Sequence, residues 1–112
     1  MPGDGGKYGL MLTTAADRDG AVKIAEMLIA ERLAACVQLL PIESFYRWKG
    51  AVAHEAELLL LIKTKAALFE DAIAAIKAVH PYETPEIVAT EFTAGFAGYF
   101  SWIDDETSAS GG

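Results

Sequence analysis

Three side chains with metal-binding chemistry come from two distant parts of the sequence. Cys36 is the single cysteine, and as a thiolate it would be a soft ligand for Cu(I) or a ligand for Zn(II). His80 offers an imidazole nitrogen, and Glu83 offers a carboxylate three residues later. Pro81 prevents one regular helix from presenting both of these side chains. Since metal sites usually need three or four ligands at recognisable spacing, this pattern is a weak metal motif.

Cys36 and His80 each have a structural alternative. Cys36 lies between Ala35 and Val37, where a small apolar side chain would fit inside a strand, since free cysteine is among the most buried residue types. His80 comes at the end of a predicted helix, where an imidazole can cap the last turn. The sequence leaves both alternatives open.

Aromatic side chains and one lysine form a second set. Tyrosine and tryptophan combine an apolar body with a polar group, which favours them at interfaces and in ligand clefts. The set comprises Tyr46, Trp48, Tyr82, Tyr99 and Trp102. Lys63 ends an apolar strand, and we expect its ammonium to pair with a carboxylate, Glu83 in the first place. The sequence contains no phosphate-binding glycine motif and no complete catalytic constellation, so we do not predict an enzyme.

Composition and charge narrow the possible partners. The chain has 112 residues, 53% hydrophobic and 22% charged, which is typical of one globular domain. The formal charge of −7 argues against nucleic acid and anionic membranes as partners, because phosphate binding needs a basic surface. We find no membrane-spanning segment and no secretory signal. A single cysteine allows no internal disulfide and suits the cytoplasm, where we expect the protein.

The hydrophobic patterns predict an α+β fold. Helices are expected after Asp17 and Thr64 as N-caps, and a hairpin turn at Lys49 and Gly50. The strands are expected at residues 8–14, 35–48, 51–63 and 86–92, with a short C-terminal helix at 99–103. This β-α-β-β-α-β order is that of a ferredoxin-like split βαβ sandwich with a long central hairpin. We expect a single domain at residues 7–105, with flexible tails at 1–6 and 106–112.

The middle of the chain is more apolar than one small sandwich requires. Residues 58–62 (LLLLI) are apolar on both faces of their strand, yet two helices cover one face of such a sheet. The predicted hairpin is also longer than an average strand pair. We therefore expect copies of the same chain to cover the other face, in a closed ring that leaves no exposed sheet edges.

Five segments stand in an order that resembles the CutA family of divalent-cation tolerance proteins. They are residues 31–37 (ERLAACV), 44–50 (SFYRWKG), 60–64 (LLIKT) after Glu57, 80–87 (HPYETPEI) and 99–102 (YFSW). The resemblance covers roughly residues 10–103. It implies a cytoplasmic homotrimer of ferredoxin-like subunits, similar to the PII signalling trimers, that binds copper and other divalent metal ions. The family has no established catalytic reaction.

The resemblance also implies two sets of site residues. His80, Cys36 and Glu83 would contact the metal ion, whereas Trp48, Lys63, Tyr82 and Glu83 would line a cleft between subunits. Members associated with copper carry a cysteine where Thr13 stands and a second histidine where Val79 stands.

Two further functions remain open beside metal binding. One is a PII-like module that holds a small anion or nucleotide in the inter-subunit clefts, with Lys63 and the aromatic side chains as contacts. The other is an assembly role in which the trimer anchors a partner and the aromatic side chains hold the subunits together.

Overall fold

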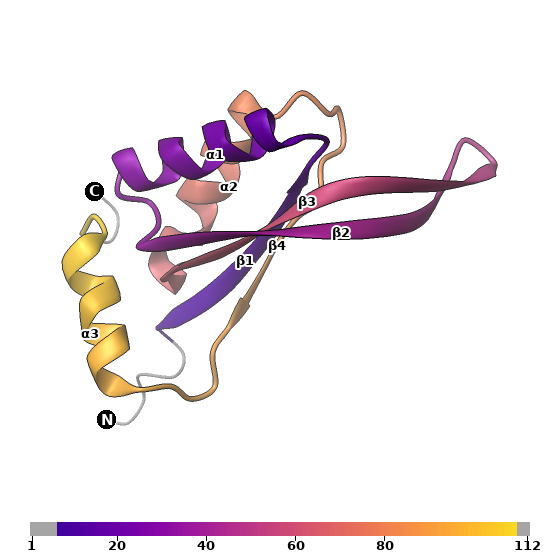
Figure 1. Cartoon of the computed structure of the whole chain (residues 1–112). Helices are drawn as coiled ribbons and strands as arrows, with labels where there is room; N and C mark the ends of the chain where they lie inside the picture. Colours follow the sequence, from indigo (N-terminus) through magenta and orange to yellow (C-terminus); the bar gives the residue numbers. More distant parts are fainter. Residues whose placement is uncertain (1–6, 110–112) are drawn as a thin grey trace.

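Four antiparallel strands form one sheet in the computed structural model, which describes residues 7–109 (Figure 1). Their order across the sheet is β2-β3-β1-β4. The elements follow one another as β1 (Tyr8–Ala15), α1 (Arg18–Ala30), β2 (Cys36–Trp48), β3 (Ala51–Lys65), α2 (Phe69–Val79), β4 (Ile87–Glu91) and α3 (Ala97–Glu106). This is the ferredoxin-like order that the sequence predicts, and the prediction of an α+β fold is confirmed.

Helices α1 and α2 lie side by side on one face of the sheet (Figure 1). The core between these layers is built from alternate residues of the strands and one stripe of each helix. Its members include Met11, Leu60 and Ile62 of the sheet and Ile24, Leu28 and Ile76 of the helices. All six are at most 3% exposed, so this face of the sheet is closed within one chain.

The other face of the sheet carries apolar side chains that α1 and α2 do not cover. Leu60 and Ile62 point toward the helices, so Leu59 and Leu61 point the opposite way and are only partly buried. The strand register places Leu40 opposite Leu59. It also places Leu12 between Leu61 and Val88. We call the surface formed by Leu12, Leu40, Leu59, Leu61 and Val88 the open face.

Local sequence signals predict two of the chain's turns and caps correctly and one wrongly. Asp17 is the N-cap of α1, and its carboxylate accepts a 2.8 Å hydrogen bond from the Gly20 amide, as predicted. Lys49 and Gly50 both have positive φ, at 51° and 83°, as a two-residue hairpin turn requires. Thr64 does not cap a helix: it is buried, and its hydroxyl donates to the Leu33 carbonyl at 2.7 Å.

The C-terminal helix packs on the end of the sheet that carries the start of β1. The Tyr8 and Phe100 rings stack with their centroids 4.5 Å apart, and the Tyr8 hydroxyl donates to Asp104 at 2.6 Å. Within the expected tail at 106–112, Thr107 is buried and the Ser108 amide donates to the Arg32 carbonyl at 2.9 Å, so these two residues pack against the fold. The expected tail at residues 1–6 and the last residues, 110–112, lie outside the described part.

Candidate functional site

The β2–β3 hairpin and the segment before β4 enclose a groove of about 790 Å³. We call it the hairpin groove. Four aromatic residues line it, namely Phe45, Tyr46, Trp48 and Tyr82. Four carboxylates also line it, namely Glu55, Glu57, Glu83 and Glu86. Glu57 of the hairpin and Tyr82 of the segment before β4 are 25 residues apart in the sequence, and the fold brings them together.

The long hairpin positions one wall of the groove. Glu55 and Glu57 are two residues apart in β3, so their side chains emerge on the same face of the strand, roughly 7 Å apart. Tyr46 lies opposite Ala53 in the neighbouring strand, next to Glu55 on that face. Its hydroxyl donates to Glu55 Oε1 at 2.7 Å. The pleat of the hairpin thus places a phenol and two carboxylates in one row.

His80 positions the opposite wall. Its side chain is buried, its Nε2 lies 2.7 Å from the Thr14 carbonyl oxygen, and its Nδ1 lies 3.2 Å from the Tyr82 amide nitrogen. A carbonyl can only accept and an amide N–H can only donate, so Nε2 carries the proton and Nδ1 accepts. The ring therefore ties the segment after α2 to the end of β1 and directs Tyr82 toward the groove.

The electrostatics of the hairpin groove are those of a negative site. The hydrogen bond to Glu55, with a smaller contribution from burial, raises the pKa of Tyr46 from 10.0 to about 12. Burial, followed by the charges of Glu57 and Glu55, raises the pKa of Tyr82. In the part of the chain that the structure describes, no lysine, arginine or histidine lines the groove. The groove therefore favours a cation and disfavours an anion.

The fold brings together three of the four predicted cleft residues. Trp48, Tyr82 and Glu83 all line the hairpin groove. Lys63 is not among its lining residues, and its ammonium instead donates to the Gln38 side-chain oxygen. The expected pairing of Lys63 with Glu83 is therefore not found.

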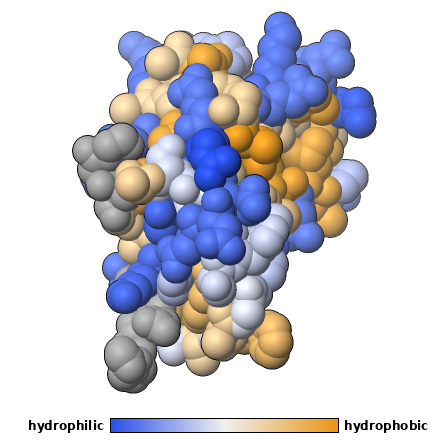
Figure 2. Space-filling view, turned by 90° about the vertical axis from the view of Figure 1, so that its left-hand side faces the viewer, coloured by the Kyte–Doolittle hydropathy of each residue, from blue (hydrophilic) through white to orange (hydrophobic). Residues whose placement is uncertain are grey.

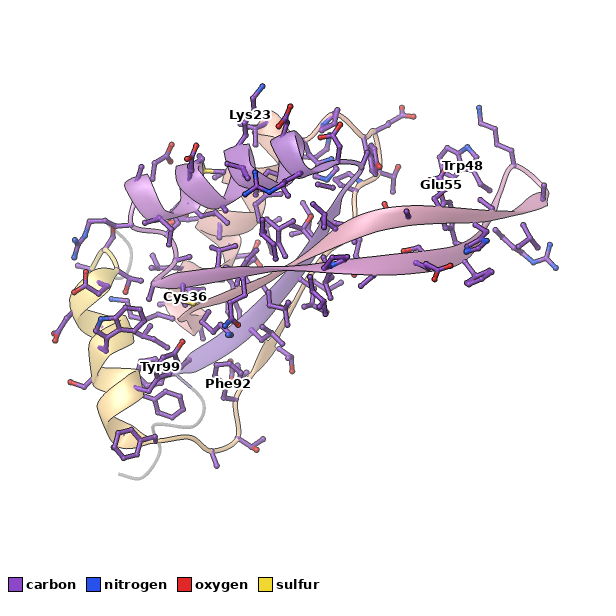
Figure 3. All side chains as sticks on the ribbon, in the orientation of Figure 1. Lys23, Cys36, Trp48, Glu55, Phe92 and Tyr99 are labelled. Carbon is purple, nitrogen blue, oxygen red and sulfur yellow. The ribbon has the colours of Figure 1, made fainter. Side chains whose placement is uncertain are left out.

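Cys36 lies at the other end of the hairpin from Trp48 (Figure 3). It is directly opposite Lys63 in the strand register and is half-buried beside Tyr99 of α3. Burial, and then the neighbouring Cys36 thiol, raise the pKa of Tyr99. The surface at this end of the molecule mixes hydrophobic and hydrophilic areas (Figure 2).

The predicted metal ligands do not meet within one chain. Cys36 is level with Leu10 across the sheet, whereas His80 contacts Thr14, four residues further along β1 and roughly 13 Å away. Among residues 7–109, no three histidine, cysteine, aspartate or glutamate side chains lie close enough to hold a metal ion. In addition, both ring nitrogens of His80 are already engaged in hydrogen bonds. One chain alone therefore does not build a metal site from Cys36, His80 and Glu83.

Two further positions, which the resemblance connects with ligands in copper-associated members, differ in their burial. Thr13 is fully buried under the helices, on the opposite face of β1 from the open face. Val79 is exposed at the end of α2.

Glu55, Glu57 and Glu86 line the groove although the sequence did not predict them as site residues. The spacing of Glu55 and Glu57 could have indicated that these two side chains lie together, since residues two apart in a strand share a face. Their approach to the segment with Tyr82 could not be inferred from spacing, because it depends on the path of the chain after α2.

Comparison with known proteins points to one family. A family model described as the CutA1 divalent ion tolerance protein matches residues 9–106. The divalent-cation tolerance protein CutA of Thermus thermophilus is 42% identical over 88% of this chain and 96% of its own length. The chloroplastic protein CutA of Arabidopsis thaliana is 37% identical over 88% of this chain, which spans about half (54%) of that longer relative.

A solved structure extends the similarity to three dimensions. It is described as the periplasmic divalent cation tolerance protein CutA of Archaeoglobus fulgidus. The two folds superpose with a TM-score of 0.87 at 33% identity, over 88% of this chain and 97% of the other. The names of these similar proteins point to different compartments, and none of the helices within residues 7–109 is long and apolar enough to cross a membrane.

Proposed function

Because this chain belongs to the CutA1 divalent ion tolerance family, we propose that it binds divalent cations, copper among them, as a homotrimer that serves divalent-cation tolerance. One observation carries the proposal: the family model matches residues 9–106, which is nearly the whole described fold. The names in this family describe tolerance to ions and no reaction. We accordingly propose a binding function and no catalytic one.

The exposed apolar surface supports the trimer. Leu40 on the open face is 49% exposed, and Phe45 and Val52 in the hairpin are each 68% exposed. Burying such side chains is favourable by about 25 cal/mol per Å² of apolar area. A second and third copy of the chain would cover the open face and the hairpin together, which a ring of three subunits allows.

The described residues of one chain do not form a metal site, so we propose that the site lies between copies of the chain. Cations would draw their ligands from more than one copy, with the Cys36 thiolate and the Glu83 carboxylate as contributions from each. His80 could contribute only through Nδ1, by displacing the Tyr82 amide. The net charge of −7 attracts cations in general without selecting one.

The hairpin groove gives little support to the alternative of a small anion or nucleotide. A phosphate needs amide or basic donors, and the described lining of the groove supplies four carboxylates instead. Lys63, the expected contact for an anion, bonds to Gln38.

The proposed location is the cytoplasm, supported by the single cysteine, whose thiol is free.

Two measurements on the same sample test the proposal. Protein purified without chelators or affinity metals is analysed for its elements, and its mass is measured by sedimentation. We expect a mass of about 36 kDa, three times 12.0 kDa, and calorimetric binding of Cu(II) or Zn(II). A measured mass of 12.0 kDa, that of a single chain, would exclude the trimer.

Substitutions identify the ligands. We expect the double variant Cys36→Ser, Glu83→Gln to bind Cu(II) about tenfold more weakly. His54→Gln is the matched control, because His54 is exposed and pairs with Glu43 at 2.7 Å, outside the groove. Unchanged copper affinity in the double variant, and in a triple variant that adds His80→Gln, would exclude all three residues as ligands.

A further inference from the structure

We draw no further inference here: the strongest candidate, the exposed aromatic patch that Phe96, Tyr99 and Trp102 form along α3, is an apolar surface without a partner in one chain, and nothing in the structure shows what covers it.

Discussion

His80 joins two segments that are 66 residues apart in the sequence, through its hydrogen bond to the Thr14 carbonyl. Nδ1 of the same ring accepts a hydrogen bond from the Tyr82 amide, and this bond directs the chain after α2 toward the groove. The resemblance to a metal-associated family predicts His80 as a metal ligand. In this fold, however, both ring nitrogens of His80 form hydrogen bonds with the backbone. A structural role and a ligand role predict different results when His80 is replaced.

Replacing His80 with leucine should lower the free energy of unfolding by about 1–3 kcal/mol, because the buried Thr14 carbonyl loses its partner. Urea denaturation of the variant measures this change. The control is His54→Leu, an exposed position whose hydrogen bond to Glu43 contributes at most about 1 kcal/mol. Equal effects of the two substitutions would contradict the structural role of His80.

The titration of Tyr46 reports the negative potential of the groove. Its pKa of about 12 arises mainly from the hydrogen bond to Glu55, because that bond stabilises the neutral phenol and the carboxylate repels the phenolate. We expect Glu55→Gln to bring the pKa of Tyr46 down toward 10.0, measured by ultraviolet difference spectroscopy against a Tyr46→Phe reference. An unchanged titration curve would show that Glu55 does not contact the phenol in solution.

At the scale of the elements, β3 is the strand on which both the core and the site depend. Its residues near the helices close the core, and its distal residues carry Glu55 and Glu57 into the hairpin. Thr64, close to its end, is buried and bonds to the Leu33 carbonyl in the loop between α1 and β2. The Thr64 hydroxyl thus connects β3 to the segment that leads into β2. The sequence had predicted this threonine as a helix cap.

Thr64→Val should therefore destabilise the fold by about 1–3 kcal/mol, because valine keeps the shape and leaves the Leu33 carbonyl without its donor. Thermal and urea unfolding measure the effect. Thr93→Val, at an exposed position in the loop after β4, serves as the control and should stay within about 0.5 kcal/mol of the parent. If Thr64→Val were as harmless as Thr93→Val, the hydroxyl would not hold this connection.

For the whole molecule, the main question is what covers the open face. The hairpin projects well beyond the two-layer body, and the chain measures 48 × 26 × 21 Å along its principal axes (Figure 1). Helices α1 and α2 close one face of the sheet, whereas Leu40 and Leu59 remain on the other. In the proposed trimer, these residues would be buried between copies.

Two matched substitutions separate the open face from the helix layer. Leu40 and Ile29 are exposed to similar degrees in one chain, 49% and 44%. We expect Leu40→Glu to shift the sedimenting species toward a single chain, because a carboxylate on the open face would be desolvated in the trimer. Ile29→Glu, on α1, should leave the mass unchanged. Two variants that behave alike would place the interface elsewhere.

The sequence by itself determined the order of the elements, the helix cap at Asp17, the hairpin turn and the apolar excess of residues 58–62. Each of these signals is local: alternation, helical spacing or turn chemistry acts over a few neighbouring residues. The same local reasoning erred at Thr64, because a threonine before a helical stripe has the pattern of a cap whether its hydroxyl bonds forward or to another segment.

Tertiary structure alone decided the partner of Lys63, the engagement of both His80 nitrogens and the meeting of Glu57 with Tyr82 in one groove. These outcomes depend on which distant segments lie side by side. A lysine at a strand end can reach any of several acceptors, and the register of β2 against β3 selects Gln38 among them. Register and loop path follow from packing of the whole chain, which spacing within one segment does not encode.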